Sequence, residues 1–164
     1  MLLPRIIPCL LIHNKGLVKT VNFKNPVYVG DPINAVKIFN EKEADEIMIL
    51  DIDASVNKSE PDFKLIEKLA MECRMPLAYG GGIHTAGQAQ TIFSLGVEKI
   101  CLSAAAIGNP SLVSEIAEIV GVQSTVVVLD VKKKFFGGYE VYSHNGKIST
   151  GRDPMSLAKI FVEK

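Results

Sequence analysis

Short apolar runs alternate with longer amphipathic segments along the whole chain. Each run is continuously apolar, which is typical of a parallel strand covered on both faces, and the segments between the runs have helical periodicity. We predict strands over Arg5–Ile12, Glu46–Ile52, Pro76–Tyr79, Lys99–Leu102 and Thr125–Val131, and helices over Pro32–Glu43, Pro61–Cys73, Ala86–Leu95, Pro110–Val120 and Pro154–Lys164. The alternation predicts an α/β fold in which right-handed crossovers connect parallel strands.

Three of the predicted helices share one type of start. Asp31, Asn109 and Asp153 each stand directly before a proline. An Asp or Asn side chain can cap the free amides of a helix, and proline fits the first helical position because its missing N–H would be unpaired there. We therefore predict that these three residues are N-caps, and Glu60 before Pro61 is a looser version of the pattern.

Two segments interrupt the alternation, Leu17–Phe23 after the first strand and Phe135–Thr150 after the fifth. The second contains Gly137–Gly138 and Asn145–Gly146 between alternating residues, which predicts hairpin strands. Both segments follow the carboxyl end of a strand, four units apart, so the pattern indicates an internal repeat.

The chain has 164 residues and five strand–helix units. A (β/α)8 barrel needs eight units and typically about 250 residues, so five units cannot close one. An open doubly wound sheet of five strands would be complete at this length. Either interpretation makes residues 1–164 one domain.

The composition of the chain argues against several classes of function. Lys+Arg and Asp+Glu balance at 18 each, so the chain has no global field to attract nucleic acid or an anionic membrane. No run approaches the roughly 20 apolar residues of a membrane span, and Arg5 and Pro8 interrupt the apolar start. The three cysteines are far apart, without CxxC or metal-ligand spacing. We expect a cytoplasmic protein with reduced thiols and no metal.

The glycine triplet Gly80–Gly82 in "YGGGIHT" is a candidate phosphate clamp. Glycines let backbone amides approach an anion, and the following helix start adds a favourable dipole. A tight turn is the alternative interpretation. Ser103 and Ala104 in "SAAAIGNP" have the same strand-to-helix position and could border the same phosphate.

Carboxylates end two of the predicted strands. Asp130 closes an apolar run, which gives the desolvation that a general acid or base needs, and Lys132 would share its face. Asp51 and Asp53 in "LDIDAS" also share a face, where they could bind substrate hydroxyls or brace the loop. For Asp130 the alternative is a structural salt bridge.

Basic residues supply two further candidates. Lys19 in the first interrupting segment could reach back to a phosphate, although a solvated surface lysine is the default. Arg5, Glu46 and Lys99 stand at strand beginnings, away from the chemistry. A structural ion-pair ring is the simplest interpretation of these three residues.

Together these motifs resemble the cyclase subunit of imidazole glycerol phosphate synthase over the whole chain. The resemblance rests on "RIIPCL", "GDP", "LDIDAS", "GGGI", "AAAIGNPSL", the strand with Asp130, and "STG". It implies the N-terminal five units of a (β/α)8 TIM barrel, a partial barrel with outer helices that lacks the last three units. It also implies an enzyme that takes ammonia from a separate glutaminase subunit and closes an imidazole ring on a bis-phosphorylated ribotide, without a cofactor.

The resemblance also assigns site residues. Asp130 matches one of the family's two catalytic aspartates, and Lys19 matches the lysine of the first mobile loop. One phosphate site corresponds to Gly80, Gly81, Gly82, Ser103 and Ala104, with Ser103 in place of the family's usual Asn. The charged gate at which ammonia enters corresponds to Arg5, Glu46 and Lys99, which favours docking to a glutaminase.

One departure concerns the second catalytic aspartate, whose position at the end of the first strand is Leu11. Leucine cannot transfer a proton, and losing one member of an acid–base pair typically costs about two to four orders of magnitude in rate. "IIPCLLI" resembles instead a paralogous group associated with surface-polysaccharide clusters. Those subunits are thought to channel ammonia to a separate sugar amidotransferase that forms an amidine.

The second departure is length, because strands six to eight of the barrel are missing. We expect a truncated product of a longer barrel, or a partial barrel that dimerises to cover its edges. Four hypotheses stay open: a glutaminase-coupled cyclase-type subunit, a non-cyclising ammonia conduit, a related phosphoribosyl isomerase, which Leu11 disfavours, and an inert truncated product.

Overall fold

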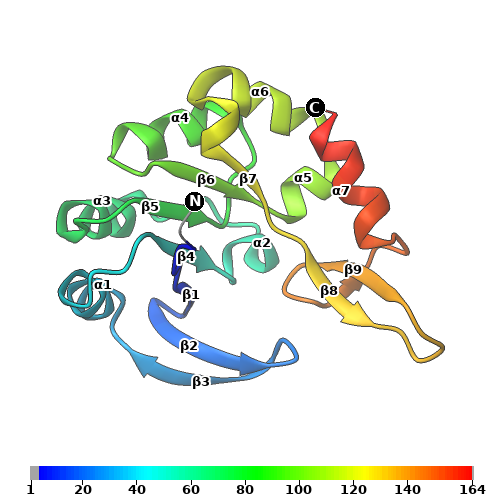
Figure 1. Ribbon diagram of the computed structural model, residues 1–164, viewed down its shortest axis with the longest axis horizontal. Coiled ribbons are helices and arrows are strands. Elements are labelled where there is room, and N and C mark those ends of the chain that lie inside the picture. Colours follow the sequence, from blue (N-terminus) through cyan, green and yellow to red (C-terminus); the bar gives the residue numbers. More distant parts are fainter. Residues whose placement is uncertain (1–3, 164) are drawn as a thin grey trace.

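The computed structural model describes residues 4–163, and a seven-stranded sheet forms its centre (Figure 1). Five of its strands run parallel, in the order β1-β4-β5-β6-β7, and a β2–β3 hairpin extends the sheet beyond β1. The strand bounds are β1 Cys9–His13, β2 Gly16–Val21, β3 Lys24–Gly30, β4 Ile47–Asp51, β5 Leu77–Gly80, β6 Lys99–Leu102 and β7 Thr125–Val127.

The order of the parallel strands decides between the two predicted architectures. A doubly wound sheet reverses its strand order at a switch point. Here each parallel strand is added beside the previous one in chain order, without a reversal. Figure 1 shows α1, α3, α4 and α6 along the outside of the curved sheet. The doubly wound alternative is therefore wrong, and the fold is a partial (β/α) barrel.

The helices confirm part of the predicted capping. The Asp31 and Asp153 side chains accept from the backbone N–H of Asn34 and Ser156, as predicted. Asn109 is not a cap; its Oδ1 accepts from the Ser111 hydroxyl instead. The main helices are α1 Pro32–Glu41, α3 Phe63–Glu72, α4 Ala86–Ser94, α6 Ser111–Val120 and α7 Pro154–Val162. The predicted end of the last helix, Lys164, lies outside the described residues.

Three short elements were not predicted, and one predicted helix begins later than expected. The short elements are α2 Ala54–Asn57, α5 Ala104–Gly108 and the 3-10 turn Val122–Ser124. The cap of α3 is Asp62, which accepts from Leu65 N–H, rather than Glu60. Each short helix follows the carboxyl end of a parallel strand by a few residues, so both contribute to the edge where the strands end.

The first and fifth predicted strands are wrong at their ends. Residues 4–8 precede β1 without belonging to the sheet, and two prolines, which have no N–H to donate, stand among them. The fifth predicted strand breaks after Val127. Asp130 instead begins β8 (Asp130–Lys133), which belongs to a second sheet with β9 (Tyr139–Ser143) and β10 (Ile148–Ser149). Asp130 therefore starts a strand of the second sheet and does not end a strand of the first.

Both interrupting segments form antiparallel hairpins, and they meet in space. The first segment was predicted only as far as Phe23, and β3 was missed. A Cβ atom added to Gly146, in the β9–β10 turn, would lie 2.7 Å from the Phe23 ring. The Lys132 ammonium lies 5.4 Å from the centroid of the same ring. The two hairpins are thus in contact although more than half of the chain separates them.

The core lies between the parallel sheet and the outer helices. Ile47, Ile49 and Ile100 on the sheet pack with helix residues such as Ile66 and Ile116, all completely buried. The opposite face of the sheet is less covered, and it carries the half-buried side chains of Leu11 and Leu50. This face leads to the pocket described below. No helix within residues 4–163 has the length and hydropathy to span a bilayer.

We predict that Gly81→Ala destabilises the fold. Gly81 has φ +124°, and an added Cβ would lie 2.5 Å from the Asp51 carbonyl oxygen, which belongs to the rigid end of β4. The expected loss in free energy of unfolding is about 1–3 kcal/mol, measured by urea titration.

The matched control is Gly87→Ala, because Gly87 lies inside α4 and its Cβ would meet only the Thr85 hydroxyl at 4.0 Å. Alanine there is expected to leave stability unchanged or to raise it by up to about 1 kcal/mol. Equal effects of the two substitutions would contradict the close approach at Gly81.

Candidate functional site

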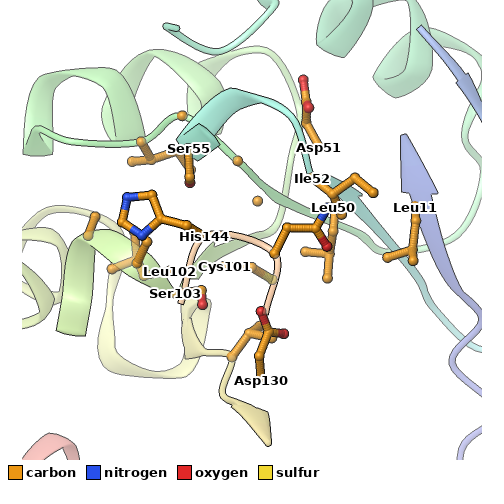
Figure 2. A pocket seen from close by; sticks show the side chains of 18 of the residues that line it. Leu11, Leu50, Asp51, Ile52, Ser55, Cys101, Leu102, Ser103, Asp130 and His144 are labelled. Atoms are coloured by element: carbon orange, nitrogen blue, oxygen red, sulfur yellow. The ribbon is translucent and has the colours of Figure 1, made fainter. Parts of the chain in front are cut away.

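A pocket of about 150 Å³ opens at the edge where the parallel strands end (Figure 2). Its floor includes Leu11 from β1, Leu50 from β4 and Cys101 from β6. The Gly80–Gly82 turn and the start of β8 form its walls. In (β/α) barrels the carboxyl ends of the strands are where ligands bind, so this pocket is the candidate site.

The glycine turn packs against its neighbours more tightly than any side chain would allow. A Cβ on Gly80 would lie 2.8 Å from the Cys101 carbonyl oxygen, and one on Gly82 would lie 2.8 Å from the Ser59 carbonyl oxygen. The turn lines the pocket, as the clamp prediction requires. At the start of α4, Thr85 and Gln88 form a capping box that occupies some of the free amides, and the predicted dipole contribution of this helix stays a prediction.

Ser103 and Ala104 line the pocket beside the glycine turn. Ser103 directly precedes α5, and its side chain makes no capping bond to that helix. A second hollow adjoins the pocket here. It shares Ser55, Ala104, Ala105 and His144 with the pocket and also includes His84. Small side chains thus leave room next to backbone amides in this part of the site.

Asp130 lies on the pocket wall, half-buried at the start of β8. Burial raises the pKa of its carboxyl group, while the positive charge of Lys132 and a backbone hydrogen bond from Gly146 act in the opposite direction. The Lys132 ammonium donates to the Gly146 carbonyl and lies 4.2 Å from the Tyr142 ring centroid. Among the described residues it forms no ion pair with Asp130 within 4 Å, so the predicted salt-bridge alternative is wrong.

Asp51 borders the pocket but braces the turn into α2. Its Oδ1 accepts from the backbone N–H groups of Asp53, at 2.9 Å, and Ala54, at 3.1 Å. Burial raises the pKa of Asp51, and these two hydrogen bonds oppose that shift. Figure 2 shows its carboxylate directed away from the middle of the pocket.

Asp53 does not line the pocket. The prediction that Asp51 and Asp53 share a binding surface is therefore wrong. Asp53 Oδ1 lies 2.7 Å from His13 Nδ1, and Oδ2 accepts from the Asn14 N–H at 2.8 Å. These bonds fix the chain where it leaves β1. Of the two predicted roles, loop bracing is the one that these contacts display.

Lys19 lies on β2 with an exposed side chain and is absent from the pocket wall. Its neighbour Thr20 lines the pocket instead, since successive residues of a strand face opposite sides. Sequence reasoning missed several pocket residues, among them the four that the two hairpins supply, Thr20, Phe23, His144 and Asn145. The Asn145–Gly146 turn signal was noticed, but it did not indicate which strand ends the turn would reach.

The three predicted gate residues form one cluster. Glu46, with 2 % of its side chain exposed, receives the Arg5 guanidinium at 3.2 Å and the Lys99 ammonium at 2.5 Å. Glu46 immediately precedes β4 and Lys99 begins β6, so the cluster lies at the amino ends of the strands, opposite the pocket. Among the described residues, no three His, Cys, Asp or Glu side chains could hold a metal ion.

A parallel sheet wound in one direction, with helices outside and a pocket at the strand ends, defines a (β/α)-barrel protein. Comparison with family models agrees with this class: the model described as "Histidine biosynthesis protein" matches residues 5–164. The chain belongs to this histidine biosynthesis family.

Individual relatives of this chain have more specific names than the family. A protein of Leptospira interrogans, provisionally named imidazole glycerol phosphate synthase subunit HisF, is 56% identical over 99% of this chain. A similarly named protein of Vibrio vulnificus is 56% identical over 97% of the chain. Imidazole glycerol phosphate synthase subunit HisF of Lactococcus lactis is 42% identical over 97%. The chain spans 65%, 62% and 62% of the lengths of these three relatives.

The buried cluster yields a stability prediction. Lys99→Met leaves the carboxylate of Glu46 without its nearest cation, while Arg5→Gln removes a partner that is 62% exposed. We expect Lys99→Met to lower the free energy of unfolding by about 2–3 kcal/mol, because Lys99 is only partly buried. Arg5→Gln should cost about 0–1 kcal/mol. Urea unfolding of both variants measures the difference, and equal losses would contradict this account.

Asp130 should make stability depend on pH. Its pKa is raised in the folded protein from the ordinary value of 3.8, so the folded state binds this proton more tightly than the unfolded state. Ionisation of Asp130 therefore disfavours folding as pH rises above 3.8. We expect Asp130→Asn to be more stable than the original chain at pH 7, with a difference that vanishes below pH 3.8.

Urea unfolding at pH 7 and at about pH 3.5 measures this difference. Glu118→Gln, on the exposed side of α6, is the control and should show none. A more stable Asp130→Asn variant at both pH values would point to a packing effect instead.

Proposed function

We propose that the chain carries a cyclase-type site of imidazole glycerol phosphate synthase, which closes an imidazole ring on a phosphorylated ribotide with ammonia. The observation that carries the proposal is Asp130, a carboxylate whose pKa burial raises, on the wall of a pocket at the strand ends. A raised pKa favours the protonated carboxyl group, which is the form that a general acid requires. The names of relatives 42–56% identical to this chain support the same reaction.

The other pocket residues fit the binding of a phosphorylated ligand. In the proposal, the backbone of Gly80–Gly82 and the Ser103 hydroxyl hold a phosphate, and Ala104 leaves space for it. Asp51 keeps the turn in place through its two amide bonds. Lys19 reaches the ligand only if its strand moves, since its exposed side chain stands outside the pocket wall.

The partner in this proposal is a glutaminase subunit that supplies ammonia. The cluster of Arg5, Glu46 and Lys99 supports this partner, because the cluster places positive and negative side chains at the amino ends of the strands, opposite the pocket. Arg5 is exposed and could exchange its bond to Glu46 for one to a partner, which would open the cluster. We place the complex in the cytoplasm, where the free thiols of the chain stay reduced.

A second candidate rests on Leu11. This residue lines the pocket at the end of β1, where an acid–base pair would need a second carboxylate. In this alternative the chain is a non-cyclising conduit that passes ammonia to a sugar amidotransferase. Its pocket then binds a phosphorylated ligand without ring closure.

One experiment separates the two candidates. We expect the chain to convert the ribotide slowly with ammonium salt, and Leu11→Asp to raise turnover by about two orders of magnitude or more, because it restores a proton-transfer group. Leu50→Asp, which places an acid elsewhere on the pocket wall, is the matched control and should not raise turnover. Product formation is followed by absorbance or mass spectrometry.

The conduit alternative predicts a different result. The chain and Leu11→Asp would then show no turnover above background, while a glutaminase still binds and Glu46→Gln weakens that binding. Turnover by the chain with no gain from Leu11→Asp would mean that the ring closes through other groups.

A further inference from the structure

The pocket contains a titratable side chain that the proposed function does not yet use. Among the described residues of its wall, four can ionise: Asp51, Cys101, Asp130 and His144. Asp51 is occupied with two backbone amides, and burial raises the pKa of the Cys101 thiol to about 12. Asp130 and His144 are therefore the two ionisable side chains of the pocket that are left for proton transfer.

His144 is presented to the pocket by a constrained turn. His144, Asn145 and Gly146 have φ of 52°, 58° and 68°, so three successive residues adopt the left-handed region. Non-glycine residues rarely do so, and such conformations concentrate at functional sites. The ring is half-buried and lines both the pocket and the adjoining hollow, and Figure 2 shows it beside Ser55.

The hydrogen bonds of His144 leave one ring nitrogen for a ligand. Nδ1 lies 3.1 Å from the Ser143 hydroxyl. Within residues 4–163, no hydrogen bond of Nε2 is found. An Nδ1 held by Ser143, and an Nε2 for which the described residues offer no hydrogen bond, suit a histidine that exchanges a proton with a bound molecule.

His144 and Asp130 are held in a fixed relation. Asp130 pairs with Tyr142 in the register of β8 and β9, two residues before His144. Lys132 ties the turn down by donating to the Gly146 carbonyl, with its ammonium over the rings of Tyr142 and Phe23. Figure 2 shows the Asp130 carboxylate and the His144 ring standing apart around the pocket. A ligand between them would meet one group on each side.

We propose that His144 is the second proton-transfer group of this pocket, in the role that Leu11 cannot fill at the end of β1. The inference rests on the proposed cyclase-type function. Ammonia adds to a carbonyl carbon of the ligand, forming a C–N bond, and the oxygen becomes a hydroxyl. Nε2 of His144 then takes a proton from the nitrogen, while Asp130 gives its proton to the hydroxyl as the C–O bond breaks and water leaves. Solvent returns the proton from His144 to Asp130, so the cycle needs no other reactant.

The test is turnover of the ribotide with ammonium salt by the full chain and by His144→Gln, measured from about pH 5 to 9. We expect His144→Gln to lose about 100-fold or more in kcat and to lose the fall in rate on the acidic side that a protonated base produces. Leu11→Asp in the His144→Gln background should restore at least part of the rate. The titratable groups that line the pocket or the adjoining hollow with His144 are Asp130, Asp51, Cys101 and His84. Lys132 on β8 adds a positive charge at the same turn, through its bond to the Gly146 carbonyl.

The matched control is Lys147→Gln, in the same turn but with an exposed side chain outside the pocket, which should retain the original rate and profile. Unfolding midpoints show whether His144→Gln is folded. The inference about His144 is wrong if His144→Gln keeps its rate within about twofold. It is also wrong if the variant loses rate but its rate still falls at acidic pH as in the original chain. In both cases the cyclase-type function stands. If the folded chain has no turnover, the proposed function fails and the inference fails with it.

Discussion

The parallel pairing of β1, β4, β5, β6 and β7 is the constraint on which the rest of this structure depends. Because each strand lies beside its predecessor and runs in the same direction, every connection returns outside the sheet. The carboxyl ends then meet at one edge, which forms the pocket, and the amino ends meet at the other. Glu46 and Lys99, 53 positions apart, touch only because of this pairing.

The pocket edge combines tight packing with an unfavourably placed charge. The Gly80–Gly82 turn fits against β4 and β6 only because it lacks side chains. Burial raises the pKa of both Asp51 and Asp130, but Asp51 is held by two backbone amides of the turn into α2, whereas Asp130 stands on the pocket wall beside the Lys132 charge. Groups that are held at a cost in stability are common where a fold performs chemistry. The contrast between these two carboxylates is the physical argument for giving them different roles.

The second sheet brings chemistry to the pocket that the parallel strands do not provide. β8 carries Asp130 and Lys132, and the turn after β9 carries His144. Contact of this turn with Phe23 joins the two hairpins beside the pocket. The end of β1 offers only Leu11 to the same space. In this structure the ionisable part of the site has shifted toward the hairpins, which is why both proposals depend on them.

Local sequence determined the repeating strand–helix order, the parallel sheet and the caps Asp31 and Asp153, because periodicity and capping act between residues a few positions apart. It also identified the strand Lys99–Leu102 with its observed bounds. Periodicity left the strand order open, and the family resemblance predicted the barrel order that the structure has. Tertiary structure alone decided that the chain leaves the first sheet after Val127 and that Thr20 rather than Lys19 faces the pocket. These outcomes depend on register and on contacts between distant segments. A shift of one residue turns every side chain of a strand to the other face, and no local pattern specifies it.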